Sequence, residues 1–417
     1  MLVGKAWSFL PLGEVAHRYS LFSAACAALA ATLVAQLAGH LCGRMLPEGS
    51  AAGHGSGPAR FAPLVATGAS GLGLAAAPAF WAQATVAEVY TLNALLLAAI
   101  LGLLICWSDR RAPGGQIGLL ALATLVLGLG LGNHVTLVFV LPLGLFYAAS
   151  YGLPTVTPRR WLIVGLALAA GLSVYAYLPI RAAQGPVANW GDPSSAERLL
   201  RHVTAADYQG YLLGRPWPEV LLRVPVVARL LFEQFTWVGV VLLLVGIWAA
   251  WQRLRRESLL LLALALAHVA FALLYNAEGS QVYLLPAYLV GALFLGLGAG
   301  WAARQVALEA RQFRRWAGLV LVGLLVLLTP AARAATAYGD VDISGDRQAL
   351  EYAVRTLTAA QPSAVLTTAR DEETFALWYA QLVLGVRPDV VVIDTRLLRH
   401  SWYRDSLERG RRGYRPG

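Results

Sequence analysis

Long apolar runs separated by short polar loops dominate the first 333 residues of this 417-residue chain. A helix needs about 20 mostly apolar residues to cross roughly 30 Å of hydrocarbon, and ten runs approach that length. The two shortest runs are joined by a hairpin that turns at Gly132, Asn133 and His134. The predicted spans are 17–43, 61–80, 88–107, 116–131, 135–151, 161–180, 231–251, 258–275, 282–302 and 316–333. The pattern predicts an all-α polytopic membrane protein.

The final segment changes character after residue 333. Residues 364–368 (AVLTT) and 390–394 (VVVID) are typical of buried strands, whereas 371–385 and 397–407 are typical of helices. Strands that alternate with helices indicate parallel βαβ units. We therefore expect two domains: a transmembrane domain over 1–333, and a small, incomplete α/β soluble domain over 334–417. No glycine-rich phosphate loop follows the first strand.

Composition agrees with a bilayer environment. The chain is 58% hydrophobic and only 13% charged, where soluble domains carry about 25% charged residues. The net charge of +10 would suggest nucleic acid in a soluble protein. Here the arginines cluster between apolar runs, which the positive-inside rule explains, so no nucleic-acid partner is predicted. The three cysteines, Cys26, Cys42 and Cys106, lack metal-ligand spacing. No cofactor is identified, and a divalent metal stays open.

The charged loops predict an orientation. Alternate loops carry the basic residues, and these loops are assigned to the cytoplasmic side: Arg44 and Arg60, Arg110 and Arg111, Arg159 and Arg160, Arg253 to Arg256, and Arg304 to Arg315. The polar loops 83–93, 132–134, 181–229 and 276–286, with the C-terminal domain, then lie extracytoplasmic, most simply across a bacterial inner membrane. The first span starts outside without a signal peptide. We therefore expect a further helix and part of an external loop upstream of Met1, with residues 2–10 as a short interfacial helix.

The extracytoplasmic loops hold most of the candidate functional residues. Glu88 stands where a helix enters the membrane, and either binds a substrate hydroxyl or cation or caps that helix. Asn133 and His134 occupy a tight turn, where Asn is also expected for backbone reasons. Tyr283 either lines a site or belongs to the interfacial aromatic belt. Since all these loops face one side, a single external site would explain them together.

Two further candidates lie in the long loop. Arg181 ends a span, and either clamps a phosphate by two parallel hydrogen bonds or snorkels to the interface. Asp192 precedes PSSAE, so a structural role at a helix start competes with a catalytic carboxylate, and the structural role is favoured.

A family resemblance emerges from five motifs taken in order: QATVAEVYTLNALLL, GLGLGNHVTL, YAYLPIRAAQGPVANWGDP, VYLLPAYLV and DEETFALWYAQLVLGVRPDVVVID. They resemble the membrane family of domain of unknown function 2723. That family is related to the protein O-mannosyltransferases and belongs to the GT-C class of glycosyltransferases that use polyprenyl-phosphate sugars. The resemblance covers nearly the whole chain.

The resemblance implies a reaction. A sugar such as mannose is transferred from a polyprenyl phosphate in the lipid bilayer to a hydroxyl of a protein or glycan acceptor, and an acidic residue deprotonates that hydroxyl. Arg181 is the implied phosphate contact. In the family the catalytic acid precedes the segment similar to LVGKAWSFLPLG, so we expect it upstream of Met1 and assign no catalytic residue. The implied pocket residues are Glu88, Asn93, His134, Asn189 and Asp192.

Two other functions compete with the transferase. Ten spans and glycine-rich helices also suit a transporter or flippase of a lipid-linked or polar substrate, although no inverted repeat is visible. A scaffold whose soluble domain recruits partners is the third hypothesis.

Overall fold

The computed structural model describes residues 2–45, 61–109, 117–151, 157–309 and 311–413, so Arg60, Arg110 and Arg111 of the predicted cytoplasmic loops lie outside the described residues. The chain forms two compact units. The first, here called the helical unit, comprises Met1–Val174 and Ala205–Val341. The second, the α/β unit, comprises Tyr175–Thr204 and Asp342–Gly417.

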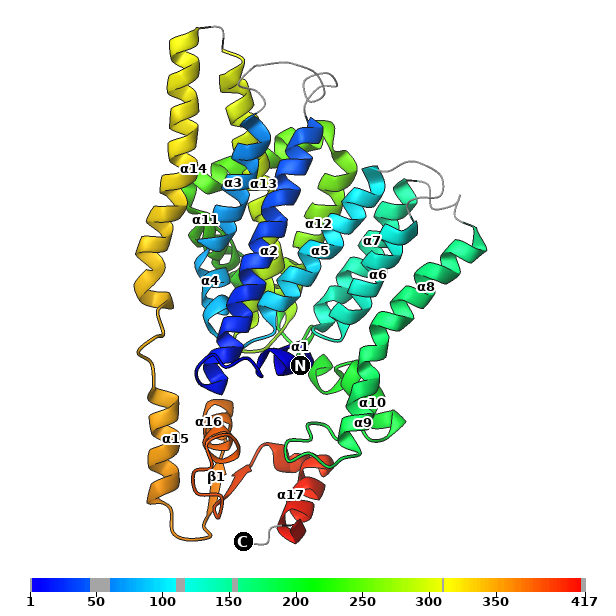
Figure 1. Cartoon of the computed structure of the whole chain (residues 1–417), viewed down its shortest axis with the longest axis vertical. Coiled ribbons are helices and arrows are strands. Elements are labelled where there is room, and N and C mark those ends of the chain that lie inside the picture. Colours follow the sequence, from blue (N-terminus) through cyan, green and yellow to red (C-terminus); the bar gives the residue numbers. More distant parts are fainter. Residues whose placement is uncertain (1, 46–60, 110–116, 152–156, 310, 414–417) are drawn as a thin grey trace. The chain divides into compact units, whose positions relative to one another are not determined.

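The helical unit is a bundle of long apolar helices (Figure 1). Among the described residues, seven helical segments are long and apolar enough to cross a membrane, and the bent pair α3–α4 adds an eighth. Residues 117–131 and 135–150 form shorter apolar helices joined by the predicted turn. All ten predicted spans thus fall on apolar helices, and the protein is an integral multi-pass membrane protein.

The elements of the helical unit are α1 (Leu2–Trp7), α2 (Val15–Met45), α3 (Ala62–Ala75), α4 (Pro78–Thr85), α5 (Tyr90–Asp109), α6 (Ile117–Leu131), η2 (Val135–Phe139), α7 (Val140–Ser150), α8 (Pro158–Leu172), η5 (Ala206–Tyr211), α11 (Trp217–Arg253), α12 (Arg255–Leu274), η6 (Ser280–Leu284), α13 (Leu285–Ala307) and α14 (Gln312–Val341).

Helix α13 is the most buried span, with 89% of its apolar window inside the protein. Its glycines permit close contact with neighbouring helices. A Cβ atom added at Gly296 would lie 2.6 Å from the Ala66 carbonyl oxygen of α3, and one at Gly300 would lie 2.6 Å from Cys42 Sγ of α2. Small residues let helix backbones approach where lipid supplies no hydrophobic driving force between helices. By contrast α14, at the edge of the bundle in Figure 1, is only 6% buried.

Two spans depart from straight helices, and the two breaks face each other. The predicted span 61–80 is not one straight helix, because α3 and α4 meet at a bend of 60°. Pro78 starts α4, and proline has no backbone N–H with which to continue the hydrogen-bond ladder of α3. Helix α11 begins earlier than predicted and is kinked at Thr236, whose φ is 60°. Next to this kink, Gln234 Oε1 accepts a hydrogen bond from the Ala79 N–H at 2.9 Å.

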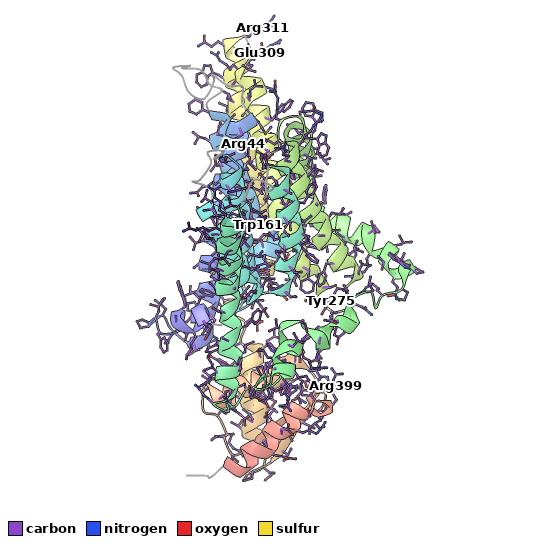
Figure 2. All side chains as sticks on the ribbon, turned by 90° about the vertical axis from the view of Figure 1, so that its right-hand side faces the viewer. Arg44, Trp161, Tyr275, Glu309, Arg311 and Arg399 are labelled. Atoms are coloured by element: carbon purple, nitrogen blue, oxygen red, sulfur yellow. The ribbon has the colours of Figure 1, made fainter. Side chains whose placement is uncertain are left out.

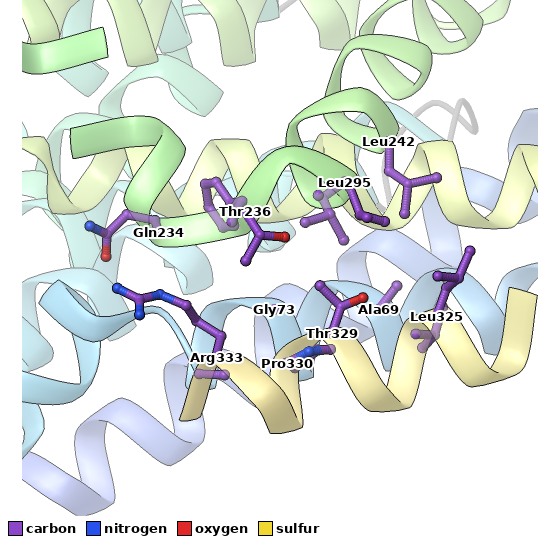
Figure 3. Close-up of a pocket in the computed structure, with 15 residues that line it drawn as sticks. Ala69, Gly73, Gln234, Thr236, Leu242, Leu295, Leu325, Thr329, Pro330 and Arg333 are labelled. Atoms are coloured by element: carbon purple, nitrogen blue, oxygen red, sulfur yellow. The ribbon is translucent and has the colours of Figure 1, made fainter. Parts of the chain in front are cut away.

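A shallow hollow lies beside this junction, between α3, α11, α13 and α14. Figure 3 shows Gln234 and Arg333 at one end of it and Leu242 and Leu325 at the other. Arg333 Nε donates to the Glu233 carbonyl oxygen at 2.8 Å, which ties α14 to the kinked helix. The hollow is therefore mostly a packing defect at the two breaks.

The α/β unit confirms the strand–helix alternation. Strands β1 (Val365–Thr368) and β2 (Val391–Asp394) pair in parallel, with Val365 opposite Val391 and Thr368 opposite Asp394. Helix α16 (Asp371–Leu382) crosses between them, as expected. The sequence did not predict α15 (Gln348–Ala359), which buries Ala353 and Leu357 against α16. The remaining elements are η4 (Ser173–Ala176), α9 (Tyr177–Ala182), α10 (Ala196–Val203), η7 (Leu397–Arg399) and α17 (Ser401–Gly413).

Candidate functional site

An aromatic cluster gathers at one end of the helical unit. The His134 ring centroid lies 5.6 Å from that of Tyr90 and 5.7 Å from that of Tyr283. Tyr283 in turn lies 5.0 Å from Phe271 and 5.4 Å from Tyr275. These five residues, here called the aromatic cluster, come from the start of α5, the α6–η2 turn, η6 and the end of α12. The cluster therefore brings together three loops that the sequence placed on one side.

Local geometry explains why these residues meet. His134 caps η2, since its Nδ1 accepts a hydrogen bond from the Thr136 N–H at 3.3 Å and lies 2.8 Å from Thr136 Oγ1. Leu212 forms an isolated antiparallel bridge with Tyr275, so the loop after η5 is held beside the end of α12.

His134 is poised as a neutral hydrogen-bond donor. Burial, with a smaller contribution from His268, lowers the pKa of His134 to about 4. The neutral ring carries one proton, and Nδ1 already accepts from a backbone N–H, so the hydrogen-bond network assigns that proton to Nε2. A neutral imidazole flanked by tyrosine rings can donate to a hydroxyl or a phosphate oxygen.

The other predicted residues of the helical unit surround the start of α5. Asn133 Nδ2 donates to the Val89 carbonyl oxygen at 3.1 Å, which ties the α6–η2 turn to the segment before α5. Glu88 lies in that segment with an exposed side chain. Asn93 is 4% exposed, and within the described residues its Oδ1 has no hydrogen-bond partner. A buried unpaired amide oxygen is costly.

The predicted residues of the α/β unit form a turn and a helix cap. Asn189 Nδ2 donates to Asp192 Oδ1 at 2.8 Å, and the Arg198 guanidinium lies 2.5 Å from Asp192 Oδ2. Asp192 is 4% exposed and has a φ of 40°. Ser195 caps α10 by accepting from the Arg198 N–H. These contacts agree with the structural interpretation of Asp192. Arg181 is exposed and donates to Gln184 Oε1 at 2.5 Å.

A buried ionic network at the opposite end of the helical unit was missed. Arg44 Nη2 lies 2.7 Å from Glu257 Oε1, and the Tyr151 hydroxyl donates to the same oxygen at 2.6 Å. Arg44 Nη1 lies 3.2 Å from Asp109 Oδ1. Glu257 is only 2% exposed. Figure 2 shows Arg44 toward one end of this unit and Tyr275 toward the other. The sequence does contain a signal for this network, because Glu257 is an acidic residue inside the basic run QRLRRES. The charge pattern alone assigned that run to a loop.

A second buried carboxylate lies at the carboxyl end of β2. Asp394 is 1% exposed and accepts from Thr374 Oγ1 at 3.0 Å and from the Arg396 backbone N–H at 2.9 Å. Burial alone would raise the pKa of Asp394, but the hydrogen bonds from Arg396 and Thr374 outweigh it and hold this pKa below its usual range. The carboxylate thus fastens the α/β unit. In the described part of the chain, no group of three His, Cys, Asp or Glu side chains is placed to hold a metal ion.

Comparisons with known proteins show which domains two segments of the chain resemble. Residues 1–151 match the Protein O-mannosyl-transferase TMEM260 N-terminal domain, and residues 349–413 match TMEM260-associated domain 2. Two segments of the chain are therefore similar to TMEM260 domains. Protein O-mannosyl-transferase TMEM260 of Mus musculus is 23% identical over 434 residues, which cover 98% of this chain and 58% of the mouse protein. The chain therefore spans less than two thirds of that relative.

The solved structures show the fold. ArnT from Cupriavidus metallidurans, crystallised with undecaprenyl phosphate, superposes with a TM-score of 0.54 at 12% identity, covering 96% of this chain and 79% of ArnT. The predicted GT-C-like helical membrane fold is confirmed.

Proposed function

We propose that this TMEM260-like protein is a membrane glycosyltransferase that moves a sugar, mannose by family resemblance, from a polyprenyl phosphate to an acceptor hydroxyl on the extracytoplasmic face. The observation that carries the proposal is the aromatic cluster, which joins three separate loops at one end of a GT-C-like bundle. Sugar and lipid-phosphate sites need a largely apolar wall with few, well-placed polar groups, and the cluster supplies both.

The orientation of the site follows from charge. Arg44, Arg253 and Arg304 gather at the end of the helical unit opposite the aromatic cluster. The positive-inside rule assigns that basic end to the cytoplasm, so the aromatic cluster faces outward. A donor whose sugar lies at the outer surface would meet it there.

The reaction exchanges one C–O bond for another. The bond from the anomeric carbon to the lipid phosphate breaks, a bond to the acceptor oxygen forms, and the acceptor proton passes to a base. His134 Nε2–H donates to a sugar hydroxyl, and Tyr90 and Tyr283 position the ring of the sugar. Asn93 Oδ1 accepts from a substrate hydroxyl.

The proposal is tested by binding, with matched controls. The purified protein in nanodiscs is titrated with a polyprenyl-phosphate mannose that carries a photoreactive lipid, and cross-linked protein is counted. We expect His134→Ala and Tyr283→Ala to weaken labelling about tenfold, since each removes one net hydrogen bond or ring contact of about 1 kcal/mol or slightly more. His17→Ala, at an exposed histidine of the same unit, should leave labelling unchanged. Equal labelling of all variants would contradict the proposal.

A further inference from the structure

A basic cavity lies at the end of the helical unit opposite the aromatic cluster. Its volume is about 280 Å³. It is lined by side chains from the last turns of α11 and α13, among them Trp248, Gln252, Arg253, Trp301, Arg304 and Gln305. The space exceeds the roughly 30 Å³ that one water molecule takes up in the liquid, so it can admit a chemical group of several heavy atoms.

The two arginines of the basic cavity differ from their neighbour Arg44. Arg44 is neutralised by Glu257 and Asp109. Arg253 and Arg304, by contrast, have no carboxylate within ion-pair distance among the described residues. Gln252 and Gln305 add amide donors to the same wall. Within the described residues, the cavity therefore offers several donors and a positive charge that no carboxylate compensates.

The ends of the two helices do not cancel that charge. Arg253 and Arg304 lie in the last turns of α11 and α13, and a helix C-terminus carries about half a negative charge. Two termini offset roughly one of the two positive charges, so about one unit remains. A ligand with a single negative charge would balance it.

The aromatic side chains place the basic cavity at a membrane surface. The rings of Trp248 and Trp301 pack edge to face with centroids 5.3 Å apart, and Trp248 is 53% exposed. Tryptophan is enriched where hydrocarbon meets headgroups, and basic cavities between spans on that side bind phosphate headgroups of lipids. Trp248 lies within the α11 span, five residues before Arg253, so an acyl chain can pass the rings while the phosphate meets the guanidinium groups.

We infer that the basic cavity binds the phosphate headgroup of an acidic bilayer phospholipid, at a site separate from the proposed sugar-transfer site. A phospholipid with one net negative charge balances the remaining charge, whereas a zwitterionic headgroup brings its own cation against the second arginine. The acyl chains follow the Trp248 and Trp301 rings into the hydrocarbon.

Native mass spectrometry of the detergent-purified full chain tests the inference. Phosphatidylglycerol, phosphatidylcholine and inorganic phosphate are titrated separately, and retained adducts are counted. We expect phosphatidylglycerol to bind in preference to phosphatidylcholine. The double variant Arg253→Gln/Arg304→Gln should lose at least about tenfold in apparent affinity, because charge-assisted hydrogen bonds to phosphate are among the strong ones. Arg255→Gln, at an exposed arginine two residues away, is the matched control and should bind as the wild type does.

The single variant Arg304→Lys keeps the charge and should retain most of the binding, which separates loss of the ligand contact from loss of the fold. Unchanged phosphatidylglycerol adducts in the double variant would overturn the inference. So would equal binding of both lipids, or binding of inorganic phosphate that displaces phosphatidylglycerol, since the ligand would then be a soluble anion.

Discussion

The buried ion pair between Arg44 and Glu257 allows a direct test of the packing at the basic end. Replacing Arg44 with Met removes the guanidinium that lies 2.7 Å from Glu257 Oε1. Glu257 would keep the hydroxyls of Tyr151 and Tyr147, at 2.6 and 3.2 Å, but it would lose its counter-charge while only 2% exposed. Removing one partner of a buried pair costs about 3–5 kcal/mol.

The second variant of the cycle, Glu257→Gln, should cost less. Its amide oxygen still accepts from the two tyrosines, and Arg44 keeps Asp109 as a partner at 3.2 Å. We expect a loss of about 1–2 kcal/mol, on the scale of a hydrogen bond to a charged group. In the double variant no buried charge is stranded at Glu257, so it should be more stable than Arg44→Met alone.

The assay is unfolding of the purified protein by sodium dodecyl sulfate in mixed micelles, followed by far-ultraviolet circular dichroism. A double-mutant cycle then isolates the coupling free energy of the pair, which should reach about 2 kcal/mol in favour of the intact pair. If Arg44→Met costs under about 1 kcal/mol, or if the two losses simply add, the pair is a solvated surface contact and the reasoning is refuted.

Three further predictions concern stability. Thr236→Gly should raise the free energy of unfolding by about 1 kcal/mol. Thr236 has a φ of 60°, and its buried hydroxyl lacks a hydrogen-bond partner among the described residues. A glycine variant that is less stable than the wild type in the same titration would contradict this prediction. Gly246→Leu should lower the free energy of unfolding by about 3 kcal/mol, because a Cβ there would overlap the Phe294 carbonyl oxygen. Gly102 has open space around it, so Gly102→Leu is the control. An equal loss of stability in both variants would exclude a packing cause. The lowered pKa of Asp394 means that its stabilisation is present above the usual aspartate pKa and is lost as pH falls below about 4. In the wild type, the protection of β1 and β2 against hydrogen exchange, taken relative to the intrinsic exchange rate at each pH, should therefore fall in acid. An Asp394→Asn variant with the same acid response would exclude this carboxylate.

The spans could be predicted because bilayer thickness imposes a length that sequence shows directly. The order of strands and helix in the α/β unit could also be predicted, since Val365–Thr368 and Val391–Asp394 are short runs rich in β-branched residues on either side of a helix with an acidic first turn. The 60° bend before Pro78 was not predicted, because proline inside an apolar run is compatible with either a kinked or a continuous span.

Only some members of the aromatic cluster could be named from the sequence. The loops holding Glu88, His134 and Tyr283 were assigned to one side from charge alternation, which is a topological argument. The aromatic cluster is completed by Tyr90, Phe271 and Tyr275. Their contacts depend on how α5 and α12 pack in the bundle, and no local sequence pattern predicts that packing. The pairing of Arg44 with Glu257 joins residues 213 positions apart, so the charge pattern alone could not separate it from an ordinary basic loop.

A proteoliposome assay distinguishes sugar transfer from lipid transport most directly. The liposomes hold the protein and a polyprenyl-phosphate mannose with a labelled sugar, and an acceptor polypeptide is present on one side of the bilayer only. The account predicts label covalently attached to the acceptor, on the side of the aromatic cluster, and a loss of about tenfold in His134→Ala but not in His17→Ala. Labelled lipid that crosses the bilayer while no label reaches any acceptor would contradict it, and would favour a flippase.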